Sequence, residues 1–360
     1  MAIAVGCLGG ELRQVDFLEV PGVRSAYAPS AALLDDRIAL GWRGPGAVDL
    51  SEDDQQLYLA FNANKEWSNT RRISGKSMFG PVLAASQKEL FIAWHGAGNL
   101  FSGSGDQRLF LASLQRDGQM RYYGAVPGAL SAGPPGLAVH EGLVYVGWRS
   151  PGNITVGVVP GNQHWINFRV FNPQTELWVG VDDNGGNIVH ANGTSGPVFA
   201  PVAGTLYGLW RGTGSLTFYG PNSDPGDPNI YYGSLDGNRW STLQLPLPTI
   251  PGALTAWSPG AVEWKGGLLV GWRGDQQKGR DPGDETLSFA RLTSARQWET
   301  IELFEDAKPA SAFAPSMAVD PREEVLWVFW RGGFNRESSN DDQQIYSATF
   351  VDPDTAGDGE

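Results

Sequence analysis

The stretch LVYVGWRS (residues 143–150) ends in a Trp-Arg pair, and the same ending recurs along the chain. It returns as IALGWRG, LYGLWRG, LLVGWRG and LWVFWRG, and once as LFIAWHG. Self-similarity at a period of this length is typical of repeat architectures. The tryptophans lie at intervals of 52, 54, 62, 62 and 58 residues: Trp42, Trp94, Trp148, Trp210, Trp272 and Trp330.

A proline precedes each of these tryptophans at a nearly constant distance. The distance is 13 residues in five copies and 15 in the last, where DPREE (320–324) lengthens a turn. The prolines are Pro29, Pro81, Pro135, Pro197, Pro259 and Pro315. Constant spacing over five copies indicates that the whole unit, and not only the Trp-Arg pair, is repeated.

Each unit reads as a series of four strands. The proline opens a short apolar run, the Trp-Arg strand follows, and a third strand begins with Asp-x-x-Leu/Ile-aromatic in most copies. A fourth strand is expected near Trp67, Trp240 or Trp298. Six units without helical periodicity predict an all-β fold, a six-bladed β-propeller of four-stranded antiparallel blades. Seven blades is the alternative.

The Trp-Arg strand is apolar on both faces. Trp272, Val270 and Leu268 share one face, and the residue before the tryptophan is small in four copies, as at Gly271. A strand of this kind is expected to lie between two neighbours, where a small residue lets the adjacent blade approach closely.

The two ends of the chain are expected to complete one blade together. Residues 3–18 (IAVGCLGGELRQVDFL) align with residues 230–245, so the chain begins with late strands of a blade. Residues 3–8 or 15–20 should therefore pair with the C-terminal strands and close the ring without a free edge. The expected domain is 1–352, followed by an acidic flexible tail at 353–360.

The third unit is irregular. NITVGVV (153–159) stands where the other copies have their third strand, and residues 176–192 read as an added hairpin. This segment (151–195) carries Asp182, Asp183 and His190, so it is the place to look for a catalytic insertion.

The composition narrows the class of protein. The 48 Gly, 24 Pro and 14 Trp favour a β protein with many turns, and the net charge of −13 with scattered basic residues argues against nucleic acid and anionic membranes. Cys7 is the only cysteine, so it cannot form an intrachain disulfide, and no apolar run approaches the length of a membrane helix. A soluble, cytoplasmic protein is expected, with secretion as the alternative.

The repeated Trp-Arg pair has a structural and a functional interpretation. In the structural one, the tryptophan is inter-blade core, and the arginine pairs with the aspartate that opens the next strand. In the functional one, the aromatic ring, the arginine and the aspartate of each blade hold a sugar, and the repetition gives avidity. The Gly/Asn/Ser/Asp-rich loops between these residues should all leave the same face of the ring.

With these residues, the chain resembles the six-bladed propeller lectins of fungi and bacteria that bind fucose. That resemblance implies carbohydrate binding between blades through Arg, an acid and an aromatic, although this sequence has Asp where that family favours Glu. The implied partner is a glycan or glycoconjugate. The candidate ligand-binding residues are Trp42, Arg43, Asp54, Trp94, His95, Asp106, Trp148, Arg149, Trp210, Arg211, Asp227, Trp272, Arg273, Asp284, Trp330, Arg331 and Asp342.

Other functions stay open at this point. A protein-interaction scaffold and an enzyme with its site in the central channel are the alternatives, and SLDGNRW (234–240) resembles the Asp-box turn of sialidases. No residues stand out as the arginine triad, tyrosine nucleophile and acid that a sialidase needs, so no catalytic residue is predicted. No cofactor is expected. The oxygen-rich stretches 222–229 and 281–285 could hold Ca²⁺, but solvated turns explain them better.

Overall fold

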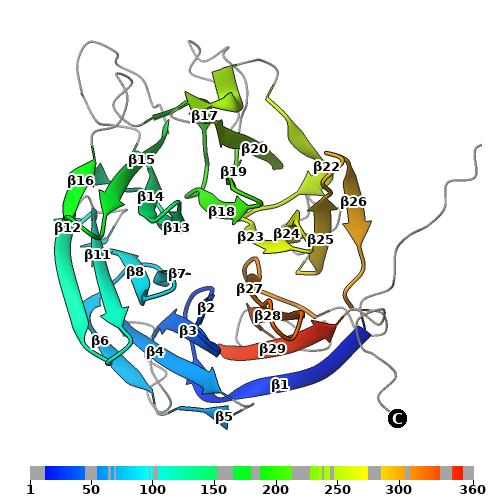
Figure 1. Cartoon of the computed structure of the whole chain (residues 1–360), viewed down its shortest axis with the longest axis horizontal. Helices are drawn as coiled ribbons and strands as arrows, with labels where there is room; N and C mark the ends of the chain where they lie inside the picture. Colours follow the sequence, from blue (N-terminus) through cyan, green and yellow to red (C-terminus); the bar gives the residue numbers. More distant parts are fainter. Residues whose placement is uncertain are drawn as a thin grey trace, which may run out of the picture.

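The chain folds into a ring of six antiparallel blades around a central axis (Figure 1). This computed structural model describes residues 13–44, 55–63, 66–68, 70–96, 98–99, 104–151, 165–179, 187–212, 228–236, 239–243, 247–274, 285–304, 309–332 and 343–351. The all-β, six-bladed prediction is confirmed, and the seven-blade alternative is wrong.

Blades are numbered 1–6 from the first complete one. The innermost strands are β2 (Ser30–Leu34), β7 (Val82–Ala85), β13 (Gly136–His140), β18 (Val198–Val202), β23 (Gly260–Trp264) and β27 (Ser316–Asp320). The second strands are β3 (Arg37–Arg43), β8 (Glu89–His95), β14 (Leu143–Arg149), β19 (Thr205–Arg211), β24 (Gly267–Arg273) and β28 (Val325–Arg331). The third strands are β4 (Gln56–Ala63), β11 (Arg108–Gln115), β15 (Trp165–Asn172), β20 (Asn229–Asp236), β25 (Leu287–Leu292) and β29 (Gln344–Val351).

The outermost strand is divided into two pieces in three of the blades. The pieces are β5 (Glu66–Trp67) and β6 (Arg71–Lys76), β16 (Leu177–Val179) and β17 (Asn187–Asn192), and β21 (Arg239–Trp240) and β22 (Thr249–Leu254), with η1 (Ser241–Leu243) after β21. Blades 2, 5 and 6 have β12 (Met120–Leu130), β26 (Trp298–Ile301) and β1 (Arg13–Arg24). A two-stranded ribbon, β9 (Gly98–Asn99) and β10 (Ser104–Gly105), follows β8. The fourth strands expected at Trp67 and Trp240 are therefore only the first halves of the outer strands.

The ring closes in blade 6, where β1 pairs antiparallel with β29. Their register runs from Arg13 opposite Val351 to Arg24 opposite Gln344. Figure 1 shows β1 along the outside of β29, so the first and last strands share one sheet. The closure prediction is confirmed for residues 15–20, whereas residues 3–8 and the predicted tail 353–360 lie outside the described residues.

The third unit needs two corrections. Its third strand is β15, not NITVGVV, which lies outside the described residues. The segment read as an added hairpin supplies β16 and β17, which both pair with β15. The unit therefore has the ordinary blade plan with a longer connection before its third strand, and of its candidate residues Asp182 and Asp183 are outside the described residues.

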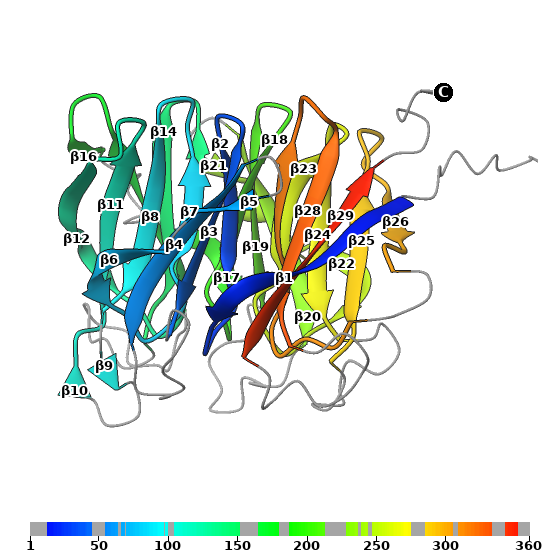
Figure 2. The ribbon, with the colours of Figure 1, turned by 90° about the horizontal axis from the view of Figure 1, so that it is seen from below.

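The two faces of the ring differ (Figure 2). The hairpins between innermost and second strands lie on one face, which we call the hairpin face. In blades 3, 4 and 5 both turn residues have positive φ, as at Glu141 and Gly142, which is the tight primed turn that suits twisted strands. The Trp-Arg ends of the second strands lie on the opposite face, which we call the loop face.

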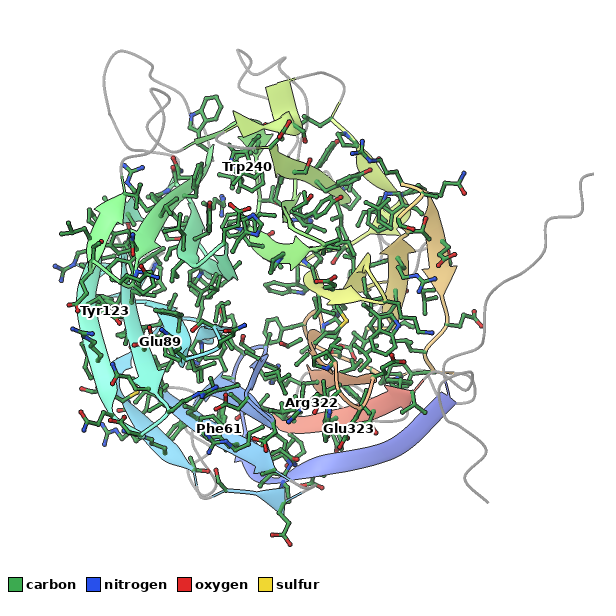
Figure 3. The ribbon with its side chains drawn as sticks, viewed as in Figure 1. Phe61, Glu89, Tyr123, Trp240, Arg322 and Glu323 are labelled. Atoms are coloured by element: carbon green, nitrogen blue, oxygen red, sulfur yellow. The ribbon has the colours of Figure 1, made fainter. Side chains whose placement is uncertain are left out.

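Side chains fill the wedges between neighbouring blades (Figure 3). In the wedge between blades 3 and 4, Trp240 meets Phe168 edge-on, with ring centroids 5.8 Å apart, and stacks on Phe199, also at 5.8 Å. Trp240 is thus a core residue at the far end of β20 from Arg211, and the Asp-box-like turn belongs to the wall of the ring. Six such clusters make up the described core.

Candidate binding site at the channel mouth

The six repeated tryptophans are buried between blades. Trp42, Trp210, Trp272 and Trp330 have no exposed surface, and Trp94 and Trp148 are 5% and 4% exposed. Each tryptophan packs with residues of the preceding blade; Trp272, for example, shares a cluster with residues of blade 4 such as Leu209. Several also stack on the aromatic residue opposite in the third strand, as Trp42 does on Tyr58 at 5.8 Å. The structural interpretation therefore accounts for all six tryptophans.

The arginine after each tryptophan points to the following blade, since consecutive residues of a strand face opposite sides. In three blades the guanidinium Nε donates to a backbone carbonyl of the following blade. The acceptor is Ser77 for Arg43, Thr255 for Arg211 and Ser311 for Arg273, at 3.0, 2.6 and 2.7 Å. Arg43, Arg273 and Arg331 are only 6–7% exposed. The Trp-Arg pair thus links three consecutive blades, which gives one physical reason for its repetition.

Of the aspartates predicted to pair with the repeated basic residues, Asp106 lies among the described residues. Asp54, Asp227, Asp284 and Asp342 lie outside the described residues. Asp106 bonds through both carboxylate oxygens to Arg108, at 2.8 and 2.7 Å, and this lowers the pKa of Asp106. Arg273 has an ion pair at 3.6 Å with Glu285, which lies two residues before β25 and was not among the predicted site residues.

His95 takes the place of the arginine in blade 2. Its Nε2 lies 2.9 Å from the carbonyl of Ser131, and its Nδ1 lies 2.7 Å from the carbonyl of Gly96. Burial lowers the pKa of His95, while these two carbonyls and Asp106 offset part of that effect. A neutral imidazole can donate to only one of the two carbonyls, so this link between blades is weaker than the arginine links.

A five-residue segment leads into each innermost strand on the loop face. These mouth segments are 25–29, 77–81, 131–135, 193–197, 255–259 and 311–315, and each ends at the repeated proline. Their backbones are fixed by the neighbouring strands: Ser77 N–H donates to the carbonyl of Gln55 at 2.8 Å, and Ala132 N–H to that of Arg149 at 2.9 Å. In four of the segments the first carbonyl, that of Ser77, Ser131, Thr255 or Ser311, also lies within hydrogen-bond distance of the preceding blade's arginine or His95. The segments are therefore held rigidly around the axis.

The middle residue of each mouth segment decides what lines the channel. It is aromatic in four blades, and the rings form a continuous row: Trp257 meets Phe313 at 5.0 Å, Phe313 stacks on Tyr27 at 5.1 Å, and Tyr27 meets Phe79 at 5.3 Å. Trp257 is 40% exposed. In blades 3 and 4 the equivalent residues are Gly133 and Ser195, so the row has a gap at their junction.

The repeated basic residue stands behind several of these rings. The guanidinium of Arg43 lies 5.6 Å from the ring centre of Tyr27, that of Arg331 lies 5.6 Å from Phe313, and His95 packs edge-on to Phe79 at 5.2 Å. Burial raises the pKa of Tyr27, and Arg43 lowers it in part. Tyr27 therefore presents an uncharged aromatic ring to the channel.

The mouth segments enclose a cavity of about 310 Å³. The four aromatic rings, all six repeated prolines and the gap residues Gly133 and Ser195 line it. This size and this mostly apolar lining are those of a small-molecule site. A second cavity, of about 520 Å³, opens on the hairpin face and includes Glu263, Lys265 and Glu324.

Sequence reasoning noted the prolines of these segments but missed the aromatic residues two positions before them. The signal was present, because aligning the six prolines places Tyr27, Phe79, Trp257 and Phe313 in one column. The Trp-Arg column is the more evident repeat in the sequence, but its aromatic rings face the core. The role of that column in ligand binding stays a prediction.

The structure also bears on metal binding and on membrane crossing. No three His, Cys, Asp or Glu side chains of the described residues are grouped so as to bind a metal ion. The two stretches considered for Ca²⁺ lie almost entirely outside the described parts of the chain. Among the residues placed by the structure, no helix combines the length and apolar character needed to cross a bilayer.

The comparisons with known proteins show the fold. No protein-family model matches the chain, and neither does any curated protein. Among solved structures, Trypanosoma rangeli sialidase is similar with a TM-score of 0.58 and 12% identity over 91% of this chain and 55% of that one. The same sialidase with sialic acid gives a TM-score of 0.53 and 11% identity over 91% of this chain and 54% of that one. This chain therefore spans about half the length of the sialidase chains.

A neighbour of more similar length is a mutant of AofleA from Arthrobotrys oligospora in which three arginines are replaced by alanine. It has a TM-score of 0.52 and 11% identity, covering 90% of this chain and 84% of that one. At identities this low, likeness extends to the propeller architecture alone.

Proposed function

We propose that the protein binds glycans and that the aromatic mouth of its channel on the loop face is the binding site. The observation that carries this proposal is the row of four aromatic rings around a cavity of about 310 Å³. A sugar ring offers an apolar C–H face that packs on an aromatic ring, and hydroxyl groups that need polar partners. The mouth has both, because backbone groups and serine or threonine hydroxyls alternate with the rings.

Trp257 is the anchor of the proposed site. It is the most exposed ring of the row, at 40%, and its edge-to-face contact with Phe313 fixes its orientation. A rigid aromatic anchor reduces the entropy lost on binding, which is why tryptophan dominates many binding sites. The likeness of the fold to a sialidase solved with sialic acid supports a sugar-sized ligand on this architecture.

The test is a glycan-array screen of the wild type beside two variants. Trp257→Ala removes the anchor, and Tyr122→Ala is the matched control, since Tyr122 is 47% exposed on β12 and does not line the mouth. We expect Trp257→Ala to weaken glycan binding by about 2 kcal/mol, or roughly thirtyfold, and Tyr122→Ala to leave it unchanged. If both variants bind glycans equally well, the binding site does not lie at the mouth.

Repeated shallow sites at the Trp-Arg-Asp positions are the second candidate, favoured by the recurrence of these residues. Stoichiometry separates the two. The mouth lies on the axis, so it predicts one bound ligand per chain in isothermal titration, whereas sites on the blades predict several. A Trp257-independent stoichiometry above one would favour the blades.

A further inference from the structure

The junction of blades 3 and 4 departs from the pattern of the other arginines. Arg149 occupies the repeated position in blade 3, yet its Nε is buried without a hydrogen-bond partner among the described residues. Arg43, Arg211 and Arg273 donate from the same atom to the next mouth segment. The Nε of Arg331 also makes no hydrogen bond within the described residues, but its guanidinium lies 5.6 Å from the ring centre of Phe313 and takes part in other interactions. Arg149 is therefore a cation placed for a bond that the described part of the chain does not supply.

A second arginine stands close to Arg149. Burial, and then the charge of Arg211, lower the pKa of Arg149 to about 10. Arg211 is itself fixed, because it donates to the carbonyl of Thr255 at 2.6 Å and to the hydroxyl of Thr194 at 2.8 Å. Arg149 remains protonated at neutral pH with such a pKa, so two like charges share this junction.

The same junction coincides with the gap in the aromatic row. Where Tyr27 and Phe313 cover Arg43 and Arg331, the equivalent residues beside Arg149 and Arg211 are Gly133 and Ser195. The hydroxyl of Ser195 is buried without a partner among the described residues. Gly133, Thr194 and Ser195 all line the cavity. Ser195 thus brings an unsatisfied hydroxyl to the side of the mouth that has no aromatic cover, and Arg149, which belongs to the same junction, is not among the residues that line the cavity.

We propose that this junction binds a carboxylate, held by Arg149 with the Ser195 hydroxyl. Two cationic groups, the Nε of Arg149 and the unpaired Ser195 hydroxyl suit an anion, and a guanidinium fork matches a planar carboxylate better than a hydroxyl. The neighbouring segment brings Trp257 to the same side, since Ser258 bonds the carbonyl of Gly196 at 2.8 Å. Resting on the proposed glycan function, this assignment makes the ligand an acidic sugar, with its apolar face on Trp257 and its carboxylate at Arg149.

The experiment compares glucuronate with glucose, which differ in a carboxylate at C6, and adds acetate as the carboxylate alone. Binding is followed by saturation-transfer NMR and by the shift in Tm at matched ionic strength. The variants are Arg149→Gln and, as a control that removes the same charge at the rim, Arg121→Gln, since Arg121 is 45% exposed and pairs with Glu176. Because Arg149 Nε makes no hydrogen bond to any residue that the structure describes, Arg149→Gln is expected to fold and to melt at the wild-type temperature or above.

We expect glucuronate to bind the wild type at least tenfold more tightly than glucose, and Arg149→Gln to lose that preference while Arg121→Gln keeps it. Acetate should raise the Tm of the wild type and not that of Arg149→Gln. Equal binding of both sugars, unaffected by Arg149→Gln, would overturn the carboxylate site and leave glycan binding intact. An Arg149-dependent effect of acetate without binding of any glycan would uphold the carboxylate site and refute the glycan function. No response to acetate or glucuronate would overturn the inference.

Discussion

Trp272 and Arg273 are consecutive residues of β24, and they pack against opposite neighbours. The ring of Trp272 lies in the cluster shared with blade 4, while Arg273 donates to the carbonyl of Ser311 in the segment that leads into blade 6. Blade 5 is therefore held to blade 4 by buried apolar packing and to blade 6 by a charge-assisted hydrogen bond. The repetition of this pair explains how blades with little sequence in common keep one geometry.

Removing the forward link should destabilise the ring. Arg273→Met would leave the carbonyl of Ser311 without its donor and Glu285 without its ion-pair partner in a buried setting. We expect a loss of about 2–4 kcal/mol in the free energy of unfolding, measured by urea denaturation. A loss below about 0.5 kcal/mol would contradict the linking role and favour the predicted ligand-binding role of Arg273.

The same substitution at Arg149 should have the opposite sign. Arg149 Nε has no partner among the described residues, and burial together with Arg211 lowers its pKa to about 10. Because the charged form is disfavoured in the folded protein, Arg149→Met should raise the free energy of unfolding by about 1–3 kcal/mol. Arg273→Met, measured in parallel, is the matched control. Equal destabilisation by both substitutions would mean that Arg149 links neighbouring blades as Arg273 does.

Much of the fold could be predicted from the sequence because the residues that recur in each unit are those that blade packing constrains. The Pro-to-Trp spacing predicted the blades, and Gly41, Gly147 and Gly271 predicted where the next blade approaches. The site was less visible. Trp42 and Trp257 are both aromatic residues at repeated positions, yet one faces the core and the other the channel, and strand alternation assigns a side only once the neighbouring blades are known. The divided outer strands also escaped notice, since short edge pieces such as β5 carry little periodic signal.

The small residue before the tryptophan gives a graded prediction. A Cβ at Gly41 would lie 3.2 Å from a methyl of Leu83 and from the ring of Pro81, whereas at Gly147 it would lie 2.4 Å from the ring of Phe199 and 2.9 Å from Pro197. Overpacking of this kind costs about 1–3 kcal/mol. Gly147→Ala should therefore lower the Tm clearly, and Gly41→Ala less, because a leucine methyl can move. A reversed order would contradict the close approach of blades 3 and 4.

His95 gives the protein a pH dependence whose sign can be tested. Burial lowers the pKa of His95 from its ordinary value of 6.5, so the folded protein favours the neutral ring. That contribution to stability is complete above pH 6.5 and is lost as the pH falls below 6.5 towards the folded-state pKa. The wild type should lose more stability than His95→Gln between pH 7.5 and about 5. A relative gain on acidification would instead indicate an imidazolium bonded to both Ser131 and Gly96.

Closure of the ring depends on a strand from the beginning of the chain. β1 supplies the outer edge of blade 6, and the side chain of Gln344 donates to the carbonyls of Val20 and Val23 at 3.0 and 3.1 Å. Without β1, β29 becomes an open edge, and the cluster that holds Val20, Val23 and Trp42 loses part of its cover. Deleting residues 1–24 should abolish the single cooperative transition in calorimetry, while Gln344→Ala should only lower its midpoint. A deletion variant that still melts in one transition at the wild-type temperature would show that five blades and an incomplete sixth suffice.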